Sequence, residues 1–299
     1  MTVPGQIVRP KLWRPETLHE ALALLREYGD EVKVVAGATA FTIAWKSGLL
    51  SARHLLGCTG IPQLRGVEEK REANTLRIGA TTTLRDVERH PLTRDRLGVL
   101  TATLGAVANL RVRNAATLGG NLVEADYSSD PPAVLSALDA RVRLESHDGG
   151  RWVPLSEFFV DYYQSVIRPD ELLTEVEVPL PAEGWRGCYL KYTSRSADDR
   201  TCLGVAALAR AGADGECAGL RLCVIGAAAT PLRLSAVEQA FVGHSLADDL
   251  ADLASQYADA ADPVSDLRGS AAYRRRLVRT LIPRAVREAV DGDRQVIRA

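Results

Sequence analysis

The chain has 299 residues, of which 46% are hydrophobic and 25% are charged. This composition is typical of a soluble globular protein with two or more packed domains, and it argues against disorder, collagen and a bundle of membrane helices. The 37 basic side chains are balanced by 38 acidic ones. A net charge of -1 provides no basic surface for nucleic acid, so partners must be inferred from particular sites.

Targeting and metal signals are missing from the sequence. No run approaches the roughly 20 apolar residues that span a bilayer, and residues 1–10 lack the apolar core of a secretory signal. We therefore expect a cytoplasmic protein with no membrane partner. The cysteines are Cys58, Cys188, Cys202, Cys217 and Cys223. Their odd number and the lack of C-x-x-C spacing argue against a disulfide framework and against an iron–sulfur cluster held by this chain alone. The histidines show no metal-ligand spacing, so we expect no metal.

Apolar spacing in the first part of the chain predicts strands that alternate with helices. The expected elements are a helix over 15–29, a strand at 32–36, a helix through 43–48, strands at 55–58 and 76–78, and helices at 84–88 and 97–110. This alternation is typical of an α/β or α+β layer in which helices cover a sheet.

The pattern changes near Pro179, where Pro181 and Gly184 also interrupt the periodicity. The elements expected beyond this point are β-type runs at 189–193, 202–208 and 220–225, followed by helices at 234–242, 246–257 and 271–290. A sheet followed by helices indicates a separate α+β domain.

Two turns of small residues are the best candidates for ligand contact. The stretch 116–121 contains paired glycines, whose missing β-carbons let a backbone turn tightly and approach a ligand. The stretch 36–40 lies between an expected strand and helix, where backbone N–H groups and the helix dipole favour a phosphate. Either stretch taken alone is also consistent with a purely structural turn. Two such turns together suit a pyrophosphate.

Asp130 precedes two prolines and the apolar run 133–138, so it is interpreted as a helix N-cap that could also touch a ligand. The sequence contains no G-x-G-x-x-G, no G-x-x-x-x-G-K and no G-x-S-x-G. The usual dinucleotide, nucleoside-triphosphate and serine-hydrolase sites are therefore not expected, and no catalytic acid or base can be named.

Several motifs resemble, in order and spacing, the FAD-binding medium subunit of the molybdenum hydroxylases, a family that includes the flavoprotein subunits of carbon monoxide dehydrogenase and xanthine dehydrogenase. The motifs are Ala36–Ala40, Ile78–Ala80, Arg111–Asn114 leading into Thr117–Asn121, Asp130–Pro132, Glu171–Glu175, Lys191–Arg195 and Gly269–Arg275. The resemblance covers nearly the whole chain. Its second turn, with Arg113 and Asn114 ahead of it, is fairly specific.

The resemblance implies an α+β fold of two parts. Residues 1–178 would form a FAD-binding domain of the p-cresol methylhydroxylase type, made of two small α+β subdomains at about 1–58 and 59–178. Residues 179–299 would form a domain like the CO dehydrogenase flavoprotein C-terminal domain, with a three-stranded sheet plus helices.

The resemblance also implies which residues hold FAD. The diphosphate and ribityl parts of FAD would be wrapped by Ala36, Gly37, Ala38, Thr39, Ala40, Thr117, Gly119, Gly120 and Asn121. Asp130 and Leu173 match further FAD-contacting positions, and Lys191 matches a lysine near the flavin. A lone strand lysine is otherwise most often a solvated side chain.

One position departs from the family pattern. The family usually has A-G-G in the first turn, and here the second glycine is replaced by Ala38. If this position needs a positive φ, a β-carbon there costs about 1 kcal/mol and crowds the phosphate.

The implied function is that of a FAD-binding electron-transfer subunit. A molybdopterin-binding large subunit would hydroxylate the substrate, and a small [2Fe–2S] subunit would pass electrons to this chain, which delivers them to an external electron acceptor. Two alternatives stay open. One is a stand-alone FAD-dependent oxidase or dehydrogenase of a small organic substrate, and the other is a binding or assembly module that has lost FAD through the change at Ala38.

Overall fold

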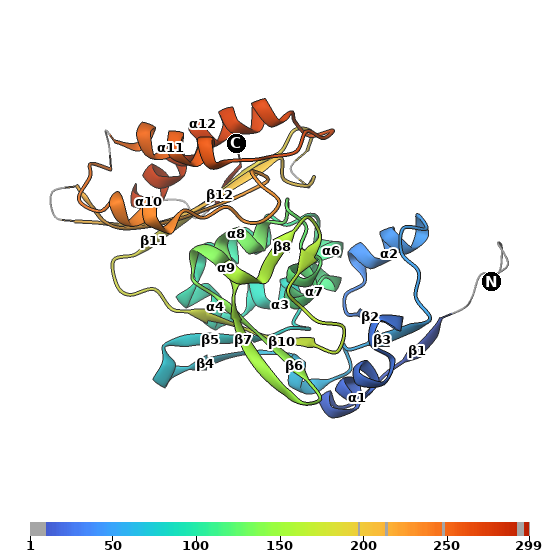
Figure 1. Ribbon diagram of the computed structural model, residues 1–299. Coiled ribbons are helices and arrows are strands. Elements are labelled where there is room, and N and C mark those ends of the chain that lie inside the picture. Colours follow the sequence, from blue (N-terminus) through green and yellow to red (C-terminus); the bar gives the residue numbers. More distant parts are fainter. Residues whose placement is uncertain (1–9, 197, 213–214, 247–248, 292–295, 299) are drawn as a thin grey trace.

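The computed structural model describes residues 10–196, 198–212, 215–246, 249–291 and 296–298. Two layered bodies lie one above the other in Figure 1, with the chain passing from the lower body to the upper one after β10. The lower body contains a three-stranded and a five-stranded sheet, and the upper body contains a third sheet covered by helices.

The first sheet is small and wholly parallel, with strand order β1-β3-β2. Its elements are β1 (Lys11–Trp13), α1 (Leu18–Tyr28), β2 (Val32–Val35), α2 (Thr39–Lys46) and β3 (His54–Gly57). α1 begins after Thr17, whose hydroxyl accepts a hydrogen bond from the Glu20 amide at 3.2 Å, and it packs an apolar stripe on one face of the sheet. α2 buries none of its side chains and stands away from the sheet in Figure 1.

The second sheet is antiparallel, with strand order β4-β5-β10-β6-β7. Its strands are β4 (Val67–Lys70), β5 (Thr75–Gly79), β6 (Arg141–Ser146), β7 (Gly149–Pro154) and β10 (Leu172–Pro179). The helices between β5 and β6 are α3 (Leu84–Arg89), α4 (Pro91–Arg96), α5 (Gly98–Gly105), α6 (Leu110–Ala115), α7 (Leu118–Val123) and α8 (Asp130–Ala137). α9 (Leu155–Phe158) and the hairpin of β8 (Phe159–Asp161) and β9 (Gln164–Ser165) follow β7. Short 3-10 turns lie at Gly29–Glu31, Pro62–Leu64 and Arg71–Ala73.

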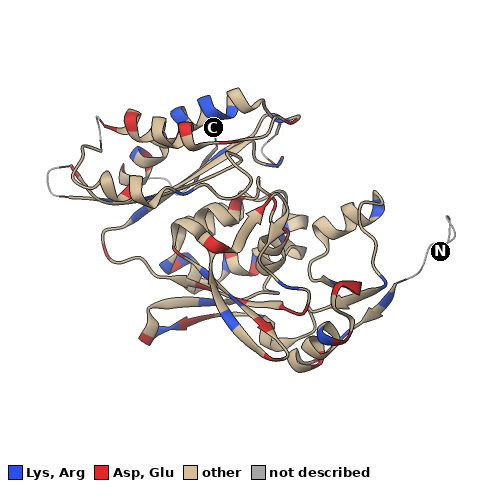
Figure 2. Ribbon diagram, viewed as in Figure 1, with Lys and Arg blue, Asp and Glu red and all other residues tan. Residues whose placement is uncertain are grey.

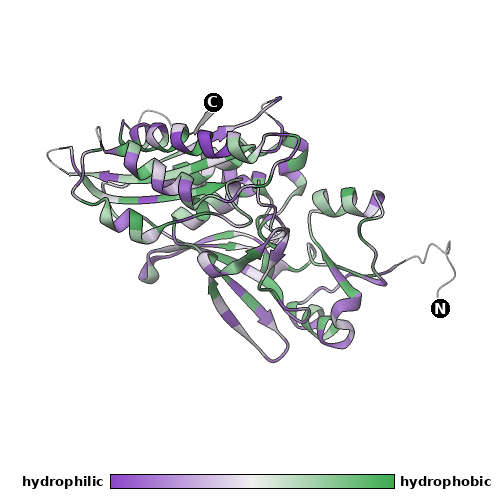
Figure 3. Ribbon diagram, turned by 45° about the horizontal axis from the view of Figure 1, so that its top comes forward, coloured by the Kyte–Doolittle hydropathy of each residue, from purple (hydrophilic) through white to green (hydrophobic). Residues whose placement is uncertain are grey.

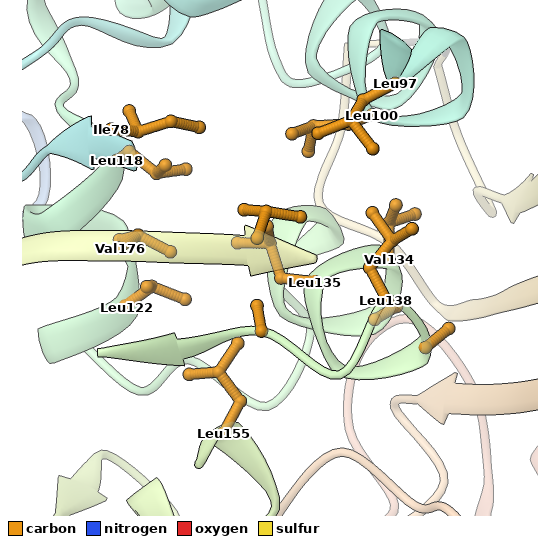
Figure 4. Packing of buried hydrophobic residues seen from close by; sticks show 14 of the residues in the cluster. Ile78, Leu97, Leu100, Leu118, Leu122, Val134, Leu135, Leu138, Leu155 and Val176 are labelled. Atoms are coloured by element: carbon orange, nitrogen blue, oxygen red, sulfur yellow. The ribbon is translucent and has the colours of Figure 1, made fainter. Parts of the chain in front are cut away.

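The core of this body forms where the sheet and its helices meet. Figure 4 shows part of it, with side chains from β5, α7, α8 and β10 filling one space: Ile78, Leu118, Leu122, Leu135 and Val176. Burial of such side chains is the main stabilising term of the fold. It also fixes α7, whose first turn contains the paired glycines of the stretch 116–121, against the end of β5.

The single helix expected over residues 97–110 is wrong. α5 ends at Gly105, and α6 begins only after Asn109, whose side chain accepts a hydrogen bond from the Val112 amide at 3.1 Å. Ala108 lies between the two helices with φ 43°. The apolar pattern alone predicts one continuous helix. The Asn109 side chain instead favours a new helix start, because it caps α6 by accepting the hydrogen bond of the Val112 amide.

The upper body contains three long antiparallel strands, β11 (Arg186–Tyr192), β12 (Leu203–Ala211) and β13 (Cys217–Ile225). The expected three-stranded sheet is thus confirmed, and a short strand, β14 (Val296–Arg298), adds a fourth member parallel to β11. The helices are α10 (Ser235–Ala240), α11 (Leu250–Ala260) and α12 (Ala271–Asp291). The helix expected over 246–257 starts later, and its residues 247–248 lie outside the described residues.

Both faces of the upper sheet are covered. α11 and α12 lie on one face, and α5 and α8 of the lower body pack on the other. In Figure 3 hydrophobic positions gather along these strands, and many hydrophilic ones lie on the helices above them. Tyr189, Leu208 and Ile225 of the upper sheet belong to the same hydrophobic cluster as α8. The two bodies therefore share a core.

Candidate functional site

The first small-residue turn links β2 to α2. Ala38 is the N-cap residue of α2, and no side chain caps this helix. The first hydrogen bond of α2 runs from the Thr42 amide to the Ala38 carbonyl at 2.9 Å, so the amides of residues 39–41 have no acceptor in the described chain. Together with the positive end of the helix dipole, these bare amides form a place for an anionic group.

Ala38 has φ 56° and ψ 12°, which is the left-handed region. The β-carbon that replaces the family's glycine therefore sits where a residue other than glycine costs about 1 kcal/mol. The turn keeps the shape that exposes the α2 amides. Replacement of the family's glycine by Ala38 therefore adds local backbone strain but leaves the conformation of the turn unchanged.

The second turn leads into α7 and uses its amides differently. The Thr117 hydroxyl accepts a hydrogen bond from the Gly120 amide at 3.1 Å. The amides of residues 118 and 119 donate to the carbonyls of Thr82 and Ala80 at 3.0 and 2.9 Å. All three amides are satisfied within the protein, so of the two turns only the one before α2 has bare amides.

Glycine is required where the two turns meet. A β-carbon on Gly37 would lie 2.0 Å from the Ala115 carbonyl oxygen, just before the second turn. One on Gly119 would lie 2.6 Å from the β-carbon of Ala80, which follows β5, so this glycine is required for the contact of α7 with the end of that strand. A β-carbon on Gly120, which is exposed, would lie 4.0 Å from that of Ala36. The two turns expected from the sequence to act together are therefore brought against each other by the fold.

Asp130 is not the N-cap of α8. Ser129 occupies the cap position without a side-chain hydrogen bond, and Asp130 is the first helical residue. One carboxylate oxygen of Asp130 accepts hydrogen bonds from the hydroxyls of Tyr189 and Thr201, each at 2.5 Å. The cap interpretation is wrong because the Asp130 carboxylate is hydrogen-bonded to Tyr189, Thr201 and Lys191 of the upper body and not to a helix-start amide.

Lys191 is not a solvated strand lysine either. Its ammonium group donates to the second Asp130 carboxylate oxygen at 2.8 Å and to the Ala106 carbonyl at 3.0 Å. The Lys191 and Asp130 side chains are only 2% and 4% exposed. Burial, and then the nearby negative charge of Asp130, raises the pKa of Tyr189 well above its usual value, so this phenol stays a neutral donor.

Leu173 and Asn121 occupy different surroundings. The Leu173 side chain is buried in the core of the lower body. A register shift in β10 follows it, and the Thr174 carbonyl there accepts a hydrogen bond from the Ala80 amide at 2.9 Å. The Asn121 side-chain oxygen accepts one from the Ser129 hydroxyl at 2.9 Å, which ties α7 to the start of α8.

The sequence did not assign a role to a polar cluster between the two bodies. The Asp266 carboxylate accepts hydrogen bonds from the Tyr127 hydroxyl at 2.6 Å and from the guanidinium groups of Arg268 and Arg274 at 2.8 and 2.6 Å. Burial alone would raise the pKa of Asp266, but these hydrogen bonds outweigh burial and hold the pKa well below its usual range. Only the motif 269–275, quoted for the resemblance, pointed to this cluster.

Metal and membrane features are not seen in the described residues. Those residues contain no group of three or more histidine, cysteine or acidic side chains able to hold a metal, and the five cysteines are buried and free. Across the same ranges every helix falls short of the length and hydrophobicity that a membrane crossing requires. Figure 2 shows basic and acidic positions interspersed along both bodies.

Comparison with known proteins gives the family. The sequence profile described as "FAD binding domain in molybdopterin dehydrogenase" matches residues 7–181, and that of the "CO dehydrogenase flavoprotein C-terminal domain" matches residues 188–289. The chain belongs to the flavoprotein subunits of the molybdenum hydroxylase family. The resemblance, the α+β fold and the assignment as an oxidoreductase subunit are thereby confirmed.

Individual relatives cover almost the whole chain. The glyceraldehyde dehydrogenase medium chain of Sulfolobus acidocaldarius is 33% identical over 92% of this chain and 96% of that one. The alpha subunit of the 6-hydroxypseudooxynicotine dehydrogenase complex of Paenarthrobacter nicotinovorans is 30% identical over 93% of this chain and 94% of that one. The solved carbon monoxide dehydrogenase of Hydrogenophaga pseudoflava matches with a TM-score of 0.90 and 31% identity, over 95% of this chain and 98% of that one.

The residues of this flavoprotein subunit fit a dinucleotide flavin. The three bare amides of α2 suit a diphosphate, and the glycine surface at Gly120 faces the same turn without a β-carbon in the way. These two turns, 36–40 and 116–121, are the ones that the sequence analysis proposed for a pyrophosphate.

Proposed function

We propose that this subunit binds FAD and transfers electrons, accepting them from a [2Fe–2S] partner subunit and delivering them to an external acceptor. The observation that carries the proposal is the bare N-terminal turn of α2 lying against the glycine turn that starts α7. When bound, FAD supplies the redox chemistry. The chain's own residues bind it, orient it and set its electrostatic surroundings.

The proposed contacts divide between two kinds of residue. Ala36, Gly37, Ala38, Thr39 and Ala40 present backbone amides and a close backbone surface to the diphosphate. Thr117, Gly119, Gly120 and Asn121 form the opposing wall. Asp130, Leu173 and Lys191 lie deeper, so we expect them to act on the flavin end mainly by fixing the backbone around it.

We also propose a division of the chain. Residues 1–178 would form the FAD-binding unit, with subdomains of about 1–58 and 59–178, since β3 ends at Gly57 and β10 at Pro179. Residues 179–299 would form the C-terminal unit. A molybdopterin-binding large subunit would be the second partner, and the cytoplasm the proposed compartment.

An anaerobic reduction experiment tests the proposal. The chain is purified from its native host, alone and with the subunits that accompany it, and its flavin absorbance is followed after adding the organic substrate of the complex. We expect bleaching only when the partner subunits are present, because this chain has no described metal cluster of its own.

Two outcomes would contradict the proposal. Rapid bleaching of the isolated chain by an organic substrate would favour a stand-alone flavin oxidase or dehydrogenase. A preparation with no flavin, alone or with its partners, would favour a binding or assembly module that has lost FAD.

A further inference from the structure

The segment 124–129, which we call the α7–α8 connection, joins the helix of the glycine turn to the helix that begins at Asp130. On its lower side it is tied to the proposed FAD site by the hydrogen bond from the Ser129 hydroxyl to the Asn121 side-chain oxygen at 2.9 Å. Because Asn121 lies on α7 beside Gly120, any shift of the connection moves one wall of that site.

The upper body holds this connection from outside. The Gly226 amide, at the end of β13, donates to the Tyr127 carbonyl at 2.8 Å. The Tyr127 hydroxyl donates to the Asp266 carboxylate at 2.6 Å, and an Arg200 guanidinium nitrogen lies 3.1 Å from the Asp126 carboxylate. Three contacts from three separate segments of the upper body thus converge on two adjacent residues.

Asp266 is in turn fixed by Arg274, the first-turn arginine of α12. The Arg274 side chain is 0% exposed and donates to the Asp266 carboxylate at 2.6 Å and to the Gly226 carbonyl at 3.0 Å. Its guanidinium carbon lies 5.8 Å from the centre of the Tyr127 ring. A buried arginine with a planar donor fork holds its partners in one geometry, which a lysine does not reproduce.

We propose that Asp266 and Arg274 are positioning residues for the FAD site, acting through Tyr127 and the α7–α8 connection on Asn121 and the glycine turn. This inference rests on the proposed FAD binding. Besides Lys191, it adds two residues of the C-terminal body to those that shape the cofactor site, although neither lies in a segment that would touch FAD. The physical basis is two groups of hydrogen bonds, one at Tyr127 and one at Ser129, which are joined by the main chain of the α7–α8 connection.

A matched pair of hydroxyl deletions tests the proposal. Tyr127→Phe removes the hydrogen bond to Asp266 and a longer one, of 3.4 Å, that the hydroxyl accepts from the Arg268 guanidinium. Tyr257→Phe is the control, because its hydroxyl contacts the Leu222 carbonyl and the Glu238 carboxylate, each at 3.3 Å, and the Leu234 amide at 3.2 Å, all within the upper body and away from the connection. Both variants are made in the full chain in its native host and purified with any accompanying subunits.

We expect Tyr127→Phe to weaken FAD retention about tenfold, measured by the recovery of free FAD fluorescence on dilution, and to change the visible circular dichroism of the remaining flavin. Tyr257→Phe lowers the melting temperature without either effect. Arg274→Lys should behave like Tyr127→Phe, since lysine keeps the positive charge but lacks the planar pair of guanidinium donors that bonds Asp266 and Gly226 together.

The outcomes separate the inference from the function on which it rests. A wild-type preparation that holds no FAD contradicts the proposed function itself. Wild-type FAD binding that is equally retained in Tyr127→Phe and Tyr257→Phe, or equally weakened in both, overturns the positioning role and leaves the proposed function standing.

Discussion

The Lys191 ammonium group donates a hydrogen bond of 2.8 Å to the Asp130 carboxylate, and this buried ion pair joins β11 of the upper body to the start of α8 in the lower one. Two hydroxyls and a main-chain carbonyl complete the shell around the pair. A buried pair of this kind contributes little net stability over an apolar replacement, but removing one partner leaves an uncompensated charge. Its value lies in fixing one arrangement of the two bodies.

Asp130→Ala should therefore lower the free energy of unfolding by about 3–5 kcal/mol, well beyond the roughly 1 kcal/mol of a lost helix cap. Denaturant unfolding with and without FAD measures the effect. Adding Lys191→Met to Asp130→Ala should recover part of the loss, because the double variant has neither buried charge. A deficit near 1 kcal/mol that the second change does not alter would show that the pair is not buried as described.

Gly120→Val should abolish FAD retention while the chain still folds. The added β-carbon would lie 2.8 Å from the Thr117 hydroxyl and 4.0 Å from the Ala36 β-carbon, so the side chain fills the space between the two turns. Gly60→Val is the control, since its β-carbon would meet only the Pro15 carbonyl at 3.9 Å. The flavin-to-protein ratio after gel filtration is the measurement, and equal ratios in the variant and the wild type would remove Gly120 from the site.

Ala38→Gly should hold FAD at least as tightly as the natural chain and raise the free energy of unfolding by up to about 1 kcal/mol. The reason is that Ala38 has φ 56°, where glycine is not strained. Ala108→Gly is a matched control, because Ala108 also has a positive φ, 43°, but lies outside the turns. Titration with FAD and thermal unfolding check both variants. Weaker FAD binding by Ala38→Gly would mean that the β-carbon is part of the fit.

The parts of the fold that could be predicted from the sequence are those set by local patterns. The helix after Pro15 and the strands of the upper sheet follow from apolar spacing and turn residues, and both are present. The two small-residue turns could also be singled out, because glycine is required wherever backbone approaches backbone, as Gly37 approaches Ala115.

Long-range partners could not be predicted in this way. Asp130 before two prolines has the local pattern of an N-cap, and Lys191 that of a strand lysine, since nothing near either residue in the sequence signals the other. The Tyr127–Asp266 contact likewise joins segments 139 residues apart. Local propensity describes the backbone at these positions, whereas tertiary packing decides what the side chains bind.

The five cysteines should react slowly with thiol reagents at pH 8 while the chain is folded. Burial raises the pKa of Cys58 to about 11 and, as the main cause, those of Cys188 and Cys223 to about 12. The reactive thiolate is then about one part in a thousand or less for these three groups. Labelling with a chromogenic disulfide, with denatured protein as the control, measures the number and rate. Prompt labelling of any of the three in the folded chain would contradict the buried placement.

Asp266 should make the stability of the chain acid-sensitive in a defined range. Its folded-state pKa lies below that of an unfolded aspartate, which is about 3.9, so the folded chain binds fewer protons. The stabilisation is therefore fully present above about pH 5 and is lost as the pH falls through and below 4.

In Asp266→Asn this titration is absent, so the difference in unfolding free energy between wild type and variant should be constant from pH 5 to 8 and shrink at lower pH. Denaturant melts of both proteins between pH 3 and 8 test this, with Asp262→Asn, at an exposed aspartate, as the control. A gap that widens as the pH falls would reverse the assigned direction and show that Tyr127 and Arg274 do not stabilise the Asp266 carboxylate.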